Sequence, residues 1–149
     1  MVTLQPITGS NRDALEALRV SPTQRRFVSE VSESLRQAAE HPGARAIPWG
    51  VYAEDTPVGF VMIADEVDGP PYIPHYWKLL IDERHQRKGY GTATLDLIVA
   101  YFRGRPGVEV IWTSAGQGEG SPIPFYERYG FEQTGELEEN EVKLRLTIV

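Results

Sequence analysis

The spacing of apolar residues along the chain predicts strands and helices in alternation. Residues 2–7 have the period-two alternation of a first strand. Ser10, with Asp13 three residues later, is typical of a helix start and predicts a helix over 13–20. Apolar residues that share one face predict a second helix over 29–40.

The middle and the end of the chain continue this pattern. Two runs rich in β-branched and aromatic residues, 49–55 and 57–66, predict an antiparallel hairpin. A strand, a helix, a strand, a short helix and two strands follow, over residues 73–82, 92–102, 108–114, 123–130, 131–137 and 141–149. The complete order predicts a mixed α/β layer architecture.

The composition fits one globular domain and excludes several classes of function. The 149 residues suit a single domain, expected over 1–149, that buries roughly two thirds of its unfolded surface. No apolar run approaches the roughly 18 residues of a membrane span, and the first residues lack a secretory signal pattern. We therefore expect a cytoplasmic protein with no membrane partner. The net charge of −6 disfavours nucleic acid as a partner.

The chain offers little for metal or thiol chemistry. It has no cysteine, which excludes disulfides, thiolate catalysis and cysteine-ligated zinc. The histidines His41, His75 and His85 are too few and too widely spaced for a convincing metal site. We therefore expect no bound metal.

The most informative stretch is the turn QRKGYG at 86–91, which joins an apolar strand to the strongest helical pattern. Such a turn points unpaired backbone N–H groups and the positive end of a helix dipole at one spot. Gly89 and Gly91 allow an anion to approach the backbone, and the side chains of 86–88 add donors and charge. From the glycines alone, a phosphate site and a simple tight turn are equally good interpretations.

Two common phosphate motifs are absent from this turn. A P-loop needs Gly-Lys followed by Ser or Thr, which none of Lys78, Lys88 and Lys143 provides. A dinucleotide fingerprint needs a third glycine where Thr94 stands. What remains is a Gln-x-x-Gly-x-Gly turn in the middle of a mixed sheet.

Two segments resemble the signatures of the GNAT family of acetyl-CoA-dependent N-acetyltransferases. LLIDERHQRKGYGTATL, at 79–95, resembles the pyrophosphate-binding signature, and FYERYGF, at 125–131, resembles the second signature. The predicted element order is similar to the GNAT fold over essentially the whole chain. Segment 23–38 further resembles the bacterial spermine/spermidine acetyltransferase branch. The resemblance implies a mixed, mostly antiparallel sheet of six or seven strands, flanked by four helices and splayed between the fourth and fifth strands.

The resemblance also implies acetyl-CoA as the cofactor, lying between the splayed strands. The backbone of 79–81 would then polarise the thioester carbonyl, although plain core packing accounts for these residues too. The family's asparagine after the fifth strand is missing, and Gln117 or Ser121 is the candidate substitute. The residues that the resemblance assigns to the cofactor are Leu79, Leu80, Ile81, Gln86, Arg87, Lys88, Gly89, Tyr90, Gly91, Thr92, Ser121 and Phe125.

Tyr126 matches the tyrosine that, in this family, protonates the departing CoA thiolate. A phenol with an ordinary pKa of about 10 is protonated at neutral pH and can donate to sulfur. Tyr129, three residues further on, faces nearly the same way but does not fit the motif. Without the resemblance, either tyrosine would be interpreted as a packing residue.

The acceptor amine must lose a proton, so a base or a water chain is needed. His75 is the first candidate, because it opens its strand, shares strand parity with Leu79 and Ile81, and titrates near neutrality. A loop histidine without a role explains His75 as well. Glu66 and Asp65, at the end of the preceding strand, are rivals as base or as anchors for a cationic substrate.

The family places the loop between its first two helices, and its last hairpin, around the acceptor amine. In this chain these two segments carry Phe27, Glu30 and Glu33, and Glu136, Glu138, Glu139 and Glu141, respectively. Clustered carboxylates would attract a polyamine. A solvated acidic hairpin tip explains the same glutamates without any substrate.

These expectations combine into one leading hypothesis and two alternatives. The leading hypothesis is acetyl transfer to a primary amine of a small cationic substrate, a polyamine first, by direct attack through a tetrahedral intermediate. The alternatives are acetylation of another amine, on an antibiotic, an amino acid or a protein, and a non-catalytic acyl-CoA sensor. Tyr126 argues against the sensor, which needs no acid near the sulfur. A homodimer is the candidate assembly.

Overall fold

The computed structural model describes residues 1–65 and 75–149, without the side chains of His75, Trp77 and Glu138. Within these residues the strands form one seven-stranded sheet in the order β1-β2-β3-β4-β5-β7-β6. Neighbouring strands are antiparallel except β4 and β5, which are parallel. The strands are β1 (Val2–Pro6), β2 (Ala46–Ala53), β3 (Thr56–Ala64), β4 (His75–Ile81), β5 (Val110–Ala115), β6 (Glu132–Glu138) and β7 (Glu141–Thr147).

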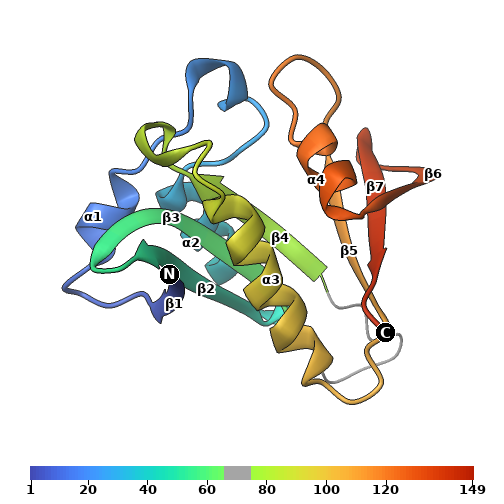
Figure 1. The fold of residues 1–149 in the computed structure, drawn as a ribbon, viewed down its shortest axis with the longest axis horizontal. Helices are drawn as coiled ribbons and strands as arrows, with labels where there is room; N and C mark the ends of the chain where they lie inside the picture. Colours follow the sequence, from blue (N-terminus) through green and yellow to red (C-terminus); the bar gives the residue numbers. More distant parts are fainter. Residues whose placement is uncertain (66–74) are drawn as a thin grey trace.

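Helices cover both faces of the sheet (Figure 1). The helices are α1 (Arg12–Glu16), α2 (Val31–Glu40), α3 (Tyr90–Arg103) and α4 (Ile123–Tyr129). The alternation of side chains along β3 explains how one strand serves two layers. Phe60 and Met62 pack with α1 and α2, whereas Val61 and Ile63 pack in a second core with α3 and α4. The predicted mixed, mostly antiparallel fold with four helices is therefore confirmed.

The first helix differs from the prediction over 13–20, because it runs only from Arg12 to Glu16. Its end is set by a contact that is distant in the sequence. The backbone N–H of Arg19 donates to Asp82 Oδ1 at 2.9 Å instead of continuing the helix. The Arg19 guanidinium donates to the carbonyl of Glu16 at 2.6 Å and so satisfies a group at the helix end. Ser10 is not the N-cap, a position that Asn11 occupies.

The sheet opens between β4 and β5. These two strands pair only where His75 lies opposite Trp112, whereas β5 and β7 pair along their whole length. Figure 1 shows β4 and β5 diverging from this end toward the loops at the top of the view. The predicted splay is confirmed, and it divides the molecule into two halves with a gap between them.

A β-bulge in β4 changes which of its side chains share a face. Met62 pairs with Lys78 and Ile63 with Tyr76, so β4 has one more residue than β3 between these pairs. The unbroken alternation on which the expectation for His75 rested is therefore interrupted between the backbone of His75 and Leu79. Tyr76 instead lies in the same core as Leu79.

Candidate active site

The turn at 86–91 leaves the first turn of α3 open to an anion. Gly89 is the N-cap of α3, with φ of 82°, and no side chain caps this end of the helix. A Cβ on Gly89 would meet nothing within 4 Å, so the space beside the backbone is free of protein atoms. Arg87 also has a positive φ, of 64°, which is unusual for a residue with a side chain. Free N–H groups and a helix dipole at one open spot are what a diphosphate needs.

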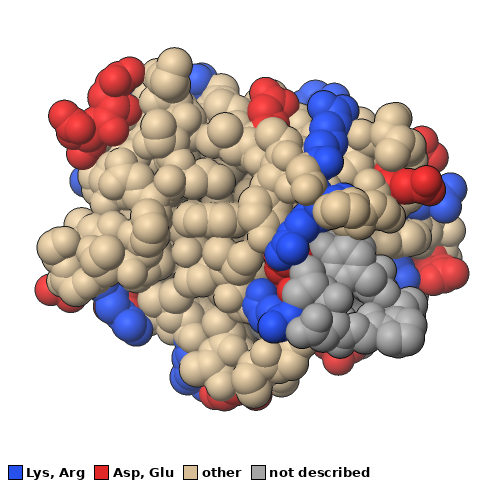
Figure 2. All heavy atoms as spheres, turned by 90° about the horizontal axis from the view of Figure 1, so that it is seen from below, with Lys and Arg blue, Asp and Glu red and all other residues tan. Residues whose placement is uncertain are grey.

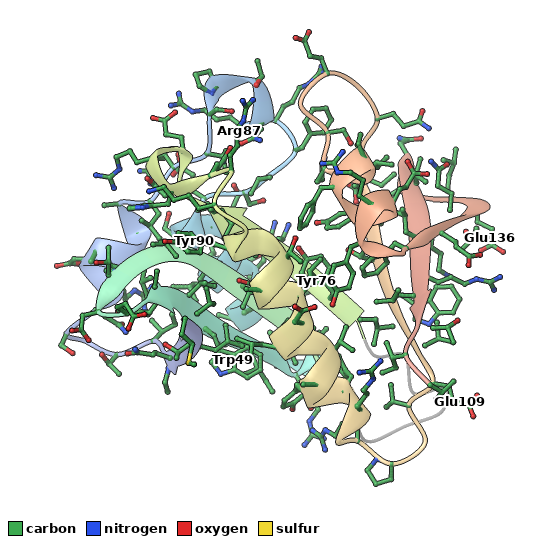
Figure 3. The ribbon with its side chains drawn as sticks, viewed as in Figure 1. Trp49, Tyr76, Arg87, Tyr90, Glu109 and Glu136 are labelled. Carbon is green, nitrogen blue, oxygen red and sulfur yellow. The ribbon has the colours of Figure 1, made fainter. Side chains whose placement is uncertain are left out.

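A cavity of about 620 Å³ begins at this turn and reaches into the gap between β4 and α4. Arg87, which lines this cavity, lies beside the loops near the top of the view in Figure 3. Most of the predicted cofactor residues line this cavity: Leu79, Ile81, Gln86, Arg87, Gly89, Tyr90, Gly91, Thr92, Ser121 and Phe125. Leu80 does not, because it is buried in the core with α1 and α2. Lys88 does not line it either, because its side chain is exposed to solvent.

Side chains on both sides hold the turn against the end of β4. The Gln86 amide donates to the Ile81 carbonyl and to Gln24 Oε1, both at 2.8 Å. Asp82, only 2% exposed, accepts from the backbone N–H of Arg19 and from the Arg84 guanidinium at 2.8 Å. Burial favours the neutral acid, but these hydrogen bonds outweigh it and lower the pKa of Asp82.

Replacing Asp82 with Asn is expected to destabilise the protein by on the order of 2 kcal/mol at neutral pH, since charge-assisted hydrogen bonds are lost. Because the folded-state pKa of Asp82 is lowered, its contribution is present above the unfolded value of about 3.9 and disappears as the pH falls through the folded pKa. Urea unfolding of both proteins at neutral and strongly acidic pH measures this. A difference in stability that does not shrink in acid would contradict the assignment.

The glycine-rich loop at 116–121 closes the top of the gap. Gly120 has φ of 88°, and a Cβ there would collide with the backbone carbonyl of Thr23, so only glycine allows this approach. Ser121 Oγ donates to the Gly116 carbonyl and accepts from the Ile123 N–H, and therefore orders the loop before α4. Of the two candidate substitutes for the family's asparagine, Ser121 lines the cavity, whereas Gln117 is exposed and lines neither cavity.

Tyr126 lies at the inner end of the cavity, on the buried face of α4. It is 6% exposed, and its hydroxyl is 3.0 Å from the Tyr76 hydroxyl. The two rings meet edge to face, with centroids 5.5 Å apart. Burial raises the pKa of Tyr126 to about 12, so its hydroxyl stays protonated at neutral pH. Burial also raises the pKa of Tyr76, which lies deep between the two halves (Figure 3).

Tyr129 has a different environment, although it lies on the same helix. Its hydroxyl donates to Asp96 Oδ1 at 2.7 Å, on α3. Burial and this hydrogen bond raise the pKa of Tyr129, but the residue lines neither cavity. The two tyrosines that the sequence could separate only by motif are thus separated by their contacts.

A second cavity, of about 180 Å³, adjoins the first across the splay. It shares Val28, Leu79, Pro122 and Tyr126 with the larger cavity. Its remaining lining residues come from the segment before α2, β4, β5, the β6–β7 turn and the start of β7: Phe27, Lys78, Ser114, Ala115, Glu139 and Glu141. Leu79 and Tyr126 therefore lie where the two cavities meet. The larger cavity begins at the glycine turn, and the smaller one is lined by two carboxylates.

The structure brings together only part of the predicted acceptor site. Phe27 lines the smaller cavity. Glu30 and Glu33 line neither cavity, and they lie 3.4 Å from Arg19 and 3.7 Å from Arg36, respectively. Glu136 lies 3.9 Å from Lys143, and Figure 3 shows it at the outer edge of the sheet, away from the gap.

The structure describes only some of the residues predicted as the base that deprotonates the acceptor amine. Glu66 lies outside the described residues, and of His75 the structure describes the backbone, at the start of β4. Asp65 is buried, forms an ion pair with Arg105 and accepts a hydrogen bond from the Tyr101 hydroxyl at 2.6 Å. It lines neither cavity, so Asp65 is a structural carboxylate and not a base for the acceptor.

Sequence reasoning missed several residues that line the cavities and also Tyr76, which lines neither cavity but contacts Tyr126. Tyr76 supports Tyr126, Lys78 lines the smaller cavity and Arg128 lines the larger one. Arg128 lies inside the FYERYGF motif and could have been proposed from its position there. Tyr76 could not, because the bulge that turns it toward Tyr126 leaves no pattern in the sequence.

Other kinds of site find no support in the part of the chain that the structure describes. Within residues 1–65 and 75–149, no group of three His, Asp or Glu side chains is arranged to hold a metal ion. No helix there is long and apolar enough to cross a membrane. Figure 2 shows charged side chains of both signs around a largely uncharged centre, so the net charge of −6 is not gathered on that face.

Comparison with known proteins decides the family. Residues 12–131 match the acetyltransferase (GNAT) family. The chain belongs to the GNAT family. A spermine/spermidine N(1)-acetyltransferase of Bacillus subtilis strain 168 is 29% identical over 147 residues, which cover 96% of this chain and 95% of that protein.

Solved GNAT structures have the same fold at low sequence identity. The PaiA N-acetyltransferase of Thermoplasma acidophilum, solved in complex with coenzyme A, has a TM-score of 0.70 at 15% identity and covers 99% of both chains. The GNAT domain of a Streptomyces lividans protein named PAT has a TM-score of 0.73 at 17% identity, over 98% of this chain and 90% of that one. The predicted family, enzyme class and cofactor are thereby confirmed: this GNAT protein is an acetyltransferase that uses acetyl-CoA.

The residues of the larger cavity fit this cofactor. The uncapped N-terminus of α3 and the open space at Gly89 suit its diphosphate, and Arg87 and Arg128 supply positive charge nearby. Leu79 and Tyr126 line both this cavity and the second chamber.

Proposed function

We propose that this GNAT protein acetylates a primary amine of a polyamine. The observation that carries the proposal is the smaller cavity, which presents Glu139 and Glu141 beside Leu79 and Tyr126, where the cofactor cavity ends. Two carboxylates in a confined space attract a polycation and favour it over a neutral amine. The spermine/spermidine acetyltransferase relative from Bacillus subtilis supports the same substrate class.

On this proposal, acetyl-CoA supplies the activated acetyl group as a thioester. The backbone N–H groups at the start of α3 bind its diphosphate, and the side chains of Gln86 and Asp82 keep that turn in place. Near Leu79, β4 pairs with β3 but has no paired strand on the side of β5, and this open side orients the acetyl end. The two chambers bring both substrates to one junction at the same time, which favours direct transfer.

Tyr126 is the proposed general acid. Its hydroxyl lies at the junction, stays protonated because burial raises its pKa to about 12, and is oriented by the hydroxyl of Tyr76. For removal of the acceptor's proton, Glu139 and Glu141 are the carboxylates of the smaller cavity, and His75 and Glu66 remain predictions. The Ser114 hydroxyl donates to Glu141 at 2.9 Å and fixes its direction.

The substrate proposal is tested by kcat/KM for spermidine, spermine, a neutral-tailed monoamine, an amino acid and a short peptide amine. We expect the polyamines to lead, and Glu141→Gln to lower kcat/KM for spermidine about tenfold, since an attraction of about 1.4 kcal/mol is lost. Glu136→Gln is the matched control: it removes the same charge from the same hairpin, outside both cavities. A preference for the amino acid or the peptide, or an equal loss in both variants, would overturn the proposal.

A further inference from the structure

A lysine of the protein itself lines the smaller cavity. Lys78, on β4, lines this cavity together with Glu139, Glu141 and Tyr126, and it is the neighbour of Leu79 at the junction. Its Nζ lies 3.3 Å from Ser29 Oγ, and its side chain is half-buried. This acetyltransferase therefore has a lysine in the wall of the chamber proposed for its substrate.

The surroundings of Lys78 make this amine easier to deprotonate than an ordinary lysine. Burial lowers the pKa of Lys78, and Glu141 and Glu33 oppose that effect only in part. Glu141 lies across the splay, on β7, where it can take up a proton from the amine. A neutral amine is the form that attacks a carbonyl carbon.

The other two lysines of the chain have no such setting. Lys143 lies 3.9 Å from Glu136, with its Nζ over the Trp112 ring at 4.7 Å from the centroid, and lines neither cavity. Lys88 is exposed to solvent in the turn before α3. Lys78 is therefore distinguished by its place in the acceptor chamber, and the chain provides two internal controls.

We propose that Lys78 is a site of self-acetylation, modified by the protein's own transfer reaction from acetyl-CoA. The inference rests on the proposed function only in taking the smaller cavity as the acceptor chamber. It requires no second protein, because Leu79 and Tyr126 join that chamber to the cofactor cavity within one chain.

Acetyl transfer to Lys78 needs only acetyl-CoA and the side chains of Glu141 and Tyr126. The Lys78 ammonium first gives up one proton, through Glu141, to solvent. The neutral Nζ then forms a bond to the acetyl carbon while the carbon–sulfur bond breaks, and the sulfur takes the proton of the Tyr126 hydroxyl. Tyr126 recovers a proton from the same nitrogen, which ends as an amide. The products are acetyl-Lys78, CoA with a free thiol, and one proton.

The modification would change the acceptor chamber permanently. Acetylation removes the positive charge of Lys78 and leaves Glu141 without this cationic neighbour. An amide is not an acyl donor of the thioester kind, so acetyl-Lys78 is an end product and not an intermediate in transfer to a free amine. The lysine instead competes with the free amine for the chamber.

The test is to incubate the purified full chain with acetyl-CoA alone and to map the acetylated lysines by peptide mass spectrometry over time. We expect one acetyl group on Lys78, formed with a first-order rate constant that does not depend on protein concentration, as for a reaction within one molecule, and slowed by added spermidine. Lys78→Arg should abolish the modification while keeping the charge, and Lys143→Arg should leave it unchanged. Tyr126→Phe should slow it about as much as it slows transfer to a free amine.

An unmodified Lys78, equal acetylation of the three lysines, or an apparent first-order rate constant that rises in proportion to protein concentration would overturn the inference. The mapping uses the unaltered protein, so it does not depend on the folding of any variant. Spermidine turnover, measured in parallel, separates the two proposals. Turnover with an unmodified Lys78 overturns only the self-acetylation, whereas a modified Lys78 without turnover of any free amine overturns only the proposed function.

Discussion

Replacing Tyr126 with Phe is expected to lower kcat about 10²- to 10⁴-fold, the range of general acid catalysis, and to leave the KM for acetyl-CoA little changed. The hydroxyl is the part that acts on the leaving sulfur, while the ring fills the junction between the cavities and is retained in Phe. Because the pKa of Tyr126 is raised to about 12, deprotonation of this acid should not reduce kcat at neutral or mildly alkaline pH. Steady-state kinetics over a pH series measures both effects.

Tyr129→Phe is the matched control, since it removes a hydroxyl from the same helix. That hydroxyl bonds to Asp96, outside both cavities, so kcat should stay close to that of the unaltered protein. If Tyr126→Phe retained full kcat, or if both variants lost it equally, Tyr126 would not be the acid.

Gly91→Val is expected to raise the Kd for CoA at least about tenfold, which corresponds to about 1.4 kcal/mol. A Cβ on Gly91 would lie only 3.0 Å from Cζ of Phe125, which also lines the cofactor cavity. The larger valine would push this ring into the cavity and cover backbone N–H groups that bind the diphosphate. Isothermal titration with CoA measures the change directly.

Gly43→Val is the control for this glycine replacement, because a Cβ at Gly43 meets nothing within 4 Å and the residue lines neither cavity. Its Kd for CoA should equal that of the unaltered protein. Unchanged CoA binding by Gly91→Val would mean that the turn has only a structural role.

Local patterns in the sequence were sufficient for most of the fold. Each strand and each long helix has its own period of apolar residues. The glycines of the turn at 86–91 indicated the start of the next helix, whose N-cap is Gly89. The end of the first helix was not predictable, since it depends on Asp82, 63 positions from Arg19. The family motifs led to the cofactor residues because each motif is one continuous stretch of the sequence.

The acceptor side was harder to predict because it depends on register. His75 was favoured on the assumption that side chains alternate along β4 without interruption. The bulge in β4 breaks this alternation and brings Tyr76 into the same core as Leu79. The glutamates of the last hairpin lie on both sides of the tight turn between β6 and β7. In this turn Glu139 and Asn140 both have positive φ. That turn directs Glu139 and Glu141 to the smaller cavity and leaves Glu136 outside, a difference that a count of acidic residues cannot reveal.

The central claim is that acetyl transfer to a polyamine occurs where the two cavities meet, with both substrates bound together. Initial rates of free-thiol release, measured over a matrix of acetyl-CoA and spermidine concentrations, test it most directly. We expect spermidine-dependent release with intersecting reciprocal plots, as for a ternary complex, and acetylspermidine formed in equal amount to CoA. Parallel plots, or no amine-dependent release from a protein that binds CoA, would contradict it.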